Sequence, residues 1–221
     1  MRNQSWIRVA DAVEITIPTT ATVYGAAFGA GSYVLVGTGG TTLVSSDAQN
    51  WQAVDSGSNQ DLLGVDYVNG QFVAVGRKGT ILTSADGLAW QLQRAPTDQG
   101  LRGIAEGNGV LLATGAGGTL VRSLDGVTWE TVQSGTSVAL YGATFAVGRF
   151  VVVGQQKTIL VSDDLGETFA SVGSALMPPK GITADLLGVT YGAGLFVAVG
   201  DGVVTSTDGL TWTVDSTSQD S

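Results

Sequence analysis

One pattern of strands and turns occurs five times along this chain, and that repetition constrains the fold more than any other feature. In the clearest copy, residues 62–90, the apolar runs LLGVDY, QFVAV and TILTS are separated by Asn-Gly and Gly-Arg-Lys-Gly and followed by Asp-Gly. Asn-Gly and Asp-Gly are typical of tight turns between antiparallel strands. One glycine recurs at Gly25, Gly64, Gly103, Gly142 and Gly188, and a second recurs at Gly37, Gly76, Gly115, Gly154 and Gly200. The repeat predicts five similar four-stranded antiparallel sheets.

Each predicted sheet has apolar residues on both of its faces, as Phe72, Val73 and Val75 show. Both faces must therefore be covered, and radial stacking of similar sheets does this while leaving only short edges. We expect an all-β fold: a single five-bladed β-propeller of four-stranded antiparallel blades that closes into one ring. An open solenoid is the alternative. The predicted repeats cover about residues 22–60, 61–99, 100–138, 139–184 and 185–221.

Residues 1–21 precede the first complete repeat, and within them Ser5–Val9 resembles the last strand of a unit that lacks its other strands. The fifth unit already has such a strand, which begins near Trp212. The N-terminal segment is therefore predicted either to pair within the ring as an added or replacement strand, or to form an arm that docks elsewhere.

A short turn motif closes every unit between its third and fourth strands. It reads Ser-x-Asp followed by a glycine in four of the five copies, and it ends on an aromatic ring. The carboxylate can accept backbone N–H bonds, and the ring can pack over the hairpin. We predict a structural role for its residues, which are Asp47, Trp51, Asp86, Trp90, Asp125, Trp129, Asp164, Phe169, Asp208 and Trp212.

This turn resembles the Asp-box, or BNR-like, motif of sialidase-like and other propellers. The fuller unit at residues 134–169 is similar to repeats of the photosystem II stability and assembly factor-like group, which also occur in proteins of bacteria and their viruses. The resemblance implies a propeller that binds a partner, with the Asp-box turns on the face away from the ligand.

Composition excludes several kinds of chemistry. The chain of 221 residues contains no Cys and no His, so thiolate nucleophiles, cysteine-bound zinc and histidine bases are absent from it. Its formal net charge of −9 disfavours nucleic acid as a partner. We found no apolar signal segment and no apolar run of membrane-spanning length, and therefore expect a protein of the cytoplasm or of a virion, without membrane insertion, cofactor or metal.

Candidate binding residues are those that differ between units, because turns fixed by folding repeat and binding loops vary on a constant scaffold. The connections between second and third strands are predicted to surround the channel mouth, and Arg102 replaces Tyr or Leu near the same place. Glu106 replaces an aromatic residue of the first strand, and Lys180 lies in the long connection before the fifth unit. The predicted binding residues are Arg77, Lys78, Arg102, Glu106, Gln155, Gln156, Lys157 and Lys180.

The seven arginines are spread over different strands and turns, so the cluster that a sialidase needs for its substrate carboxylate is not predicted, and we expect no enzyme. A non-catalytic interaction module, structural or adhesive, such as a component of a phage virion, is the first hypothesis. A glycan-binding lectin and an intracellular assembly factor that holds a protein partner are the alternatives. The predicted partner is accordingly a protein surface, a glycan or other virion proteins.

Overall fold

The computed structural model describes residues 18–172 and 185–214, which form five four-stranded antiparallel sheets. The predicted N-terminal strand and Lys180 lie outside the described residues. In each sheet the strands follow one another in chain order, as in a meander. The only helical elements described are four short 3-10 turns, one between the second and third strands of each of the first four sheets. The prediction of an all-β, five-bladed propeller is confirmed.

We number the blades from one to five in chain order. Blade one contains β1 (Val23–Gly29), β2 (Ser32–Gly37), η1 (Thr38–Gly40), β3 (Thr42–Ser45) and β4 (Gln52–Val54). Blade two contains β5 (Leu62–Val68), β6 (Gln71–Gly76), η2 (Arg77–Gly79), β7 (Ile81–Ser84) and β8 (Gln91–Gln93). Blade three contains β9 (Leu101–Gly107), β10 (Val110–Gly115), η3 (Ala116–Gly118), β11 (Leu120–Ser123) and β12 (Glu130–Val132). Blade four contains β13 (Leu140–Ala146), β14 (Arg149–Gly154), η4 (Gln155–Lys157), β15 (Ile159–Ser162) and β16 (Ala170–Ser171). Blade five contains β17 (Leu186–Gly192), β18 (Leu195–Gly200), β19 (Val203–Ser206) and β20 (Thr213–Val214).

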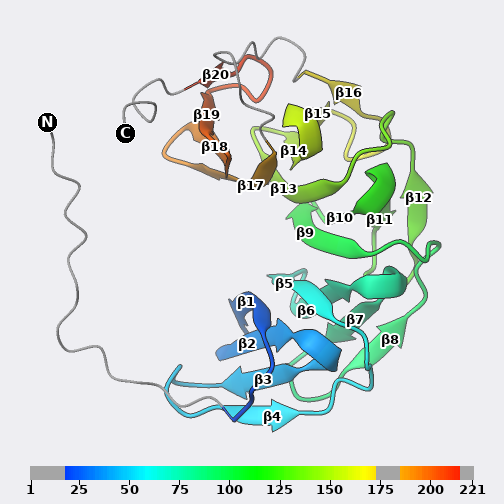
Figure 1. The fold of residues 1–221 in the computed structure, drawn as a ribbon, viewed down its shortest axis with the longest axis vertical. Coiled ribbons are helices and arrows are strands. Elements are labelled where there is room, and N and C mark those ends of the chain that lie inside the picture. Colours follow the sequence, from blue (N-terminus) through cyan, green and yellow to red (C-terminus); the bar gives the residue numbers. More distant parts are fainter. Residues whose placement is uncertain (1–17, 173–184, 215–221) are drawn as a thin grey trace, which may run out of the picture.

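The blades are arranged radially, with the first strand of each blade innermost and the fourth outermost (Figure 1). The repeated glycines permit this arrangement. A Cβ atom added at Gly64 would lie 2.4 Å from the carbonyl oxygen of Arg102 in the next blade, so only glycine lets these inner strands approach so closely. At Gly76 an added Cβ would lie 2.2 Å from the carbonyl oxygen of Asp61, which precedes the first strand of the same blade.

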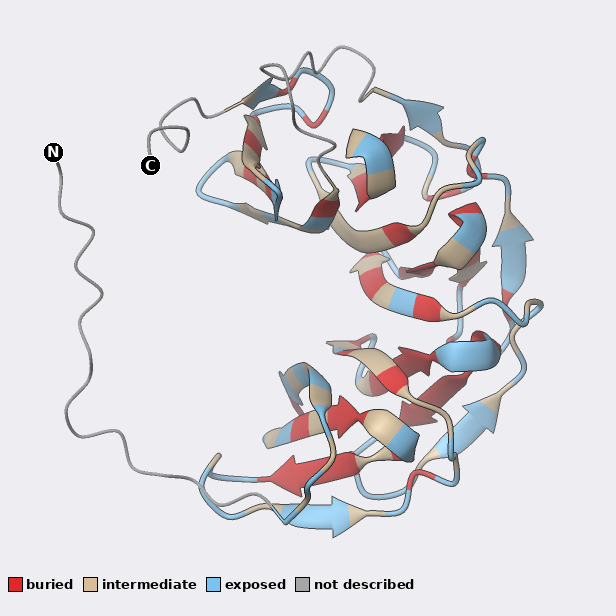
Figure 2. Cartoon of the chain, in the orientation of Figure 1, coloured by how far each residue is buried: buried red, intermediate tan, exposed pale blue. Residues whose placement is uncertain are grey.

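Apolar cores lie between consecutive blades. Phe72 and Ala74 of β6 pack towards blade one, whereas Val73 and Val75 of the same strand pack towards blade three. This alternation follows from the period of two residues in a strand, and it confirms that each sheet buries both of its faces. Buried residues concentrate in the middle strands, and the outermost strands are mostly exposed (Figure 2).

The described residues form four such cores, one at each junction between consecutive blades. No buried apolar cluster joins blade five to blade one within residues 18–172 and 185–214. The blades accordingly follow an arc that is open between the first and the fifth blade (Figure 1). The sequence predicts the blades and their radial stacking correctly, but the closed ring that it also predicts is not formed by the described part of the chain.

Candidate functional site

The inner end of each first strand carries a β-bulge, and these bulges build the mouth of the central channel. In β9, for example, Leu101 pairs with Gly115 and Gly103 pairs with Thr114, so that Arg102 is left over between them. Bulges of this kind redirect the side chain of the extra residue. The same irregularity occurs in all five blades, and its extra residues are Tyr24, Leu63, Arg102, Tyr141 and Leu187.

These five residues and Arg77 line one depression of about 550 Å³. Four of the six side chains are aromatic or aliphatic, and Tyr24 and Leu187 are well exposed there. The two charged residues are both arginines. The depression therefore combines an apolar lining with positive charge, on a protein whose formal net charge is −9.

The two guanidinium groups are held in different ways. That of Arg102 lies over the Tyr141 ring, 5.2 Å from its centre, in a cation–π arrangement. The Nε atom of Arg77 lies 2.8 Å from Oδ2 of Asp61. Arg102 forms no ion pair with any described residue.

Asp61 orients Arg77. The backbone N–H of Gly39 and the Arg77 side chain both donate hydrogen bonds to its carboxylate, and together they lower the pKa of Asp61. Asp61 thus stays ionised under ordinary conditions. Because the Arg77 side chain is 63% exposed, its pair with Asp61 positions the guanidinium without removing it from solvent.

The other predicted binding residues in the turns do not line this depression. Lys78 is at the same end of its blade as Arg77, but it borders a neighbouring depression of about 410 Å³ together with Gln60 and Arg94. Gln155 accepts a hydrogen bond from the backbone N–H of Ala139 through Oε1, a contact within its own blade. The backbone N–H of Gln156 donates to Asp185, which precedes blade five.

Lys78, Gln156 and Lys157 share an uncommon backbone conformation. Their φ values are 54°, 55° and 58°, in the left-handed region that favours glycine. Three sister residues, Gly40, Gly79 and Gly118, stand where Lys157 stands in blade four. Each of these residues is therefore held at a conformational cost.

Glu106 lies at the far end of β9, away from the channel mouth. Its carboxylate accepts a hydrogen bond of 2.6 Å from the backbone N–H of Gly109, in the turn to β10. Partial burial raises the pKa of nearby Asp66, and the negative charge of Glu106 adds to this effect. The structure thus separates Glu106 from Arg102, which the sequence had grouped with it.

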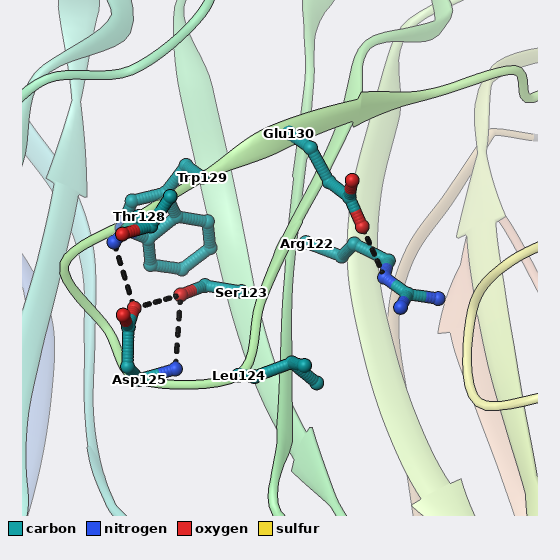
Figure 3. Close-up of a pocket in the computed structure, with 7 residues that line it drawn as sticks. All are labelled: Arg122, Ser123, Leu124, Asp125, Thr128, Trp129 and Glu130. Atoms are coloured by element: carbon teal, nitrogen blue, oxygen red, sulfur yellow. Dashed lines mark hydrogen bonds and ion pairs between the residues drawn. The ribbon is translucent and has the colours of Figure 1, made fainter.

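The Ser-x-Asp turns occupy the opposite end of the blades from the mouth, because strands alternate in direction along each meander. In blade three, Asp125 accepts hydrogen bonds from the hydroxyl of Ser123 and from the backbone N–H of Thr128, at 3.0 and 2.7 Å (Figure 3). The backbone N–H of Val127 also donates to it, at 2.8 Å. The indole Nε1–H of Trp129 donates to the carbonyl of Gly126. The two backbone bonds, that from Thr128 foremost, lower the pKa of Asp125 to about 2.

A depression of about 310 Å³ lies beside this turn, and Arg122 and Glu130 complete its lining (Figure 3). Its charged groups already have partners: Nε of Arg122 lies 2.8 Å from Glu130, and the same guanidinium reaches Glu167 of blade four at 3.4 Å. Asp125 is also hydrogen-bonded within its turn. This depression therefore has fewer charged groups without an intramolecular partner than the channel mouth has.

Within residues 18–172 and 185–214, no group of three or more acidic residues is placed to hold a metal ion. None of the helical turns described has the length and apolar composition of a membrane span.

The fold and the mouth define a β-propeller in which apolar side chains and two arginines line a depression at one end of the channel. No family model and no curated protein matches the chain. Among solved structures it is similar to YCF48 bound to D1 peptide, with a TM-score of 0.69, 19% identity, and 92% of this chain and 70% of that chain covered. It is also similar to YCF48 from Cyanidioschyzon merolae, with a TM-score of 0.65, 13% identity, and coverages of 93% and 75%. At these identities the likeness establishes the fold.

Sequence reasoning missed most of the mouth. It selected Arg77 and Arg102, which the structure brings together. Tyr24, Tyr141 and the leucines at the same position of the repeat were used only for comparison with Arg102 and were not predicted to line the mouth. The sequence does mark these residues, because each directly precedes the first repeated glycine and breaks the alternation of inward and outward side chains along the first strand. Asp61, which positions Arg77, was also missed.

Proposed function

We propose that this protein is a non-catalytic binding module that holds an acidic segment of a protein partner at its channel mouth. The observation that carries the proposal is the convergence of five bulge residues, Arg102 among them, with Arg77 around one depression. A carboxylate can pair with the guanidinium groups while apolar side chains of the same segment contact Tyr and Leu.

The structural neighbours support this kind of function. YCF48 is a propeller of related fold, and one of the two structures holds it bound to D1 peptide. This favours the assembly-factor hypothesis over the structural or adhesive role in a virion, for which the comparisons offer no support. The Ser-x-Asp turns act in this proposal as structural Asp-box motifs, far from the partner.

We further propose that the channel mouth does not catalyse a reaction. Among the described lining residues of the mouth there is no carboxylate, and the only hydroxyls are those of Tyr24 and Tyr141. General acid–base chemistry needs a pair of groups in reach of one bond, and this lining does not offer one.

The test is binding of fluorescent peptides by anisotropy, using an array of acidic and of neutral sequences. We expect acidic peptides with apolar residues to bind, with an affinity that falls as salt rises. Arg77→Gln/Arg102→Gln should weaken this binding by about tenfold or more, which is the effect of losing charged hydrogen bonds. Arg94→Gln is the matched control, because Arg94 is exposed outside the mouth. Equal binding by both variants would refute the mouth as the site.

A glycan is the second ligand class, and the exposed Tyr24 ring at the mouth is the observation that favours it. A neutral oligosaccharide would stack on the ring and would bind with little salt dependence. Screening the same variants on a glycan array separates the two ligands. Retention of neutral sugars with no peptide binding would replace the first proposal by the second.

A further inference from the structure

The end of the blades opposite the mouth carries exposed apolar side chains that the fold does not require. We call it the turn end, because it contains the Ser-x-Asp turns and the turns between first and second strands. In four blades the residue two positions after the turn Asp donates its backbone N–H to that carboxylate, at 2.8 Å. Gln49 of blade one shows that a polar side chain suits this position. Leu88, Val127 and Leu210 occupy it in blades two, three and five, and they are 43–55% exposed.

Val147 is a second such residue, in the turn between the first and second strands of blade four. Its φ is 54°, in the left-handed region, and it is 59% exposed. That conformation is particularly unfavourable for a β-branched residue. The sister turns have the same conformation but contain Asn or Ala, at Ala30, Asn69, Asn108 and Ala193. Val147 therefore costs stability without being buried, which is typical of residues retained for a function.

Val147 and Leu210 lie at the same junction. The guanidinium of Arg149, two residues after Val147, donates a hydrogen bond of 2.8 Å to the carbonyl oxygen of Asp208, two residues before Leu210. The two exposed apolar side chains thus come from turns that are in direct contact, one in blade four and one in blade five.

Blade three adds Leu124, which is 66% exposed. Sister units have Ser46, Ala85 and Thr207 at its position. Its side chain points away from Trp129, and both residues line the depression of about 310 Å³ described above (Figure 3). A side chain of a partner can enter this depression beside Leu124. The residues that we call the turn-end patch are Leu124, Val127, Val147 and Leu210.

The charge at the turn end indicates the kind of partner that fits the patch. Among the described residues its cations are Arg122 and Arg149, and each is paired, with Glu130 at 2.8 Å and with Asp163 at 3.0 Å. The described carboxylates at this end are Asp47, Asp66, Asp86, Glu106, Asp125, Glu130, Asp163, Asp164, Glu167 and Asp208. The remaining described cations lie at the mouth end, and they are Arg77, Lys78, Arg94, Arg102 and Lys157. The potential at the turn end is therefore negative, and it favours a partner that carries positive charge.

We propose that the turn end is a second docking surface, which binds a basic amphipathic segment of a protein partner. Apolar residues of the segment contact the turn-end patch, and its Lys or Arg side chains face the surrounding carboxylates. The mouth end of a second copy is a poorer partner, because carboxylates such as Asp61, Asp185 and Asp201 offset its cations. Since the mouth and the turn end lie on opposite sides, one propeller can hold an acidic and a basic segment at the same time.

The first test measures fluorescence anisotropy with a short labelled peptide of alternating lysine and leucine. We expect it to bind with an affinity that falls as salt rises. A lysine–serine peptide should bind at least roughly tenfold more weakly, because it lacks the apolar contacts. Equal binding of the two peptides would mean that charge alone attracts them, and would overturn the proposal.

The second test locates the site with Val147→Asn/Leu210→Gln, which introduces residues that sister units have at these positions. The double variant should weaken binding of the lysine–leucine peptide by roughly tenfold or more. Leu92→Gln, at an exposed apolar residue of β8, is the matched control and should bind normally. Arg77→Gln/Arg102→Gln should also bind this peptide normally, so that failure at the mouth and failure at the turn end are distinguished. Unchanged binding by the folded Val147→Asn/Leu210→Gln chain would refute the site.

The single variant Val147→Asn separates a binding role from a structural one. Asn tolerates the left-handed region better than Val, so the variant should raise Tm by roughly 2–4 °C while it weakens peptide binding. A lower Tm would show that Val147 stabilises the fold, and would count against the proposal. Light scattering of the chain alone checks the other occupant: self-association that Val147→Asn/Leu210→Gln abolishes would assign the turn end to a second copy instead.

Discussion

Two adjacent glycines in η3, Gly117 and Gly118, allow the cost of backbone conformation to be separated from the cost of space. Their φ values are 62° and 74°, both in the left-handed region. An added Cβ at Gly117 has only the Gln99 side chain near it, at 3.8 Å, whereas at Gly118 it would lie 2.0 Å from the carbonyl oxygen of Thr136. Gly117→Ala and Gly118→Ala therefore differ mainly in the space available to one methyl group.

The expected magnitudes follow from these contacts. A left-handed conformation costs a residue other than glycine about 1–2 kcal/mol, and loss of the freedom of glycine in the unfolded chain returns about 0.5–1 kcal/mol. Gly117→Ala should thus reduce the free energy of unfolding by about 0.5–1 kcal/mol. Gly118→Ala must also displace a backbone carbonyl, and overpacking of this kind adds about 1–3 kcal/mol.

Thermal unfolding followed by circular dichroism tests this difference. At this chain length 1 kcal/mol corresponds to a shift in Tm of about 2–4 °C, so Gly117→Ala should lower Tm by only a few degrees, and Gly118→Ala by about twice as much or more. Equal shifts would refute the argument that the neighbouring connection, rather than the backbone angle, requires Gly118.

Three further predictions concern the turns and the junctions. The pKa of Asp125 falls from 3.8 to about 2 on folding, so its carboxylate stabilises the fold fully above pH 4, and this stabilisation is lost as pH falls towards 2. Asp125→Asn should flatten this part of a plot of the free energy of unfolding against pH. An unchanged plot would contradict the prediction. Trp90→Ala should lower the free energy of unfolding by about 1–4 kcal/mol in urea titrations, through lost packing near Phe72, while peptide binding at the mouth is retained. Val68 and Glu106 occupy, in blades two and three, the positions at which Gly29 meets Tyr67. Val68→Gly and Glu106→Phe should each lower the free energy of unfolding, and the double variant should be more stable than the sum of the two changes predicts, by about 0.5 kcal/mol or more; simple additivity would exclude contact between positions 68 and 106.

The blades could be predicted from the sequence because every strand pairs with a strand close to it in the chain. A glycine in the turn between the first two strands, the Ser-x-Asp turn and the alternating apolar residues determine this local meander. The bulges could not be found in the same way, since a bulge is an extra residue in one strand relative to its partner, and the register of the pair has to be known first. The mouth consequently contains Arg77 and Arg102, as predicted, within a lining that the sequence did not identify.

Curvature was the other property that the repeat did not specify. A blade buries its two faces equally well in rings of different size, and propellers typically contain four to eight blades. The angle between two blades depends on the particular side chains that meet at their junction. The repeated pattern contains only the residues that all units have in common, so it does not specify this angle. A sequence with five units therefore predicted five blades, but it did not determine whether five blades complete the circle.

At two junctions an aromatic ring of one blade packs beside a glycine of the preceding blade: Tyr67 beside Gly29, and Phe145 beside Gly107. These pairs also account for Glu106, the most conspicuous departure from the repeat. In blade two the small residue of the pair is replaced by Val68, which is buried, so the space that Gly29 and Gly107 leave for an aromatic ring is already filled. A ring at position 106 would overlap with the valine. Glu106 instead turns to the backbone N–H of Gly109 and reaches solvent at the strand end. Its substitution is thus compensated within its own junction.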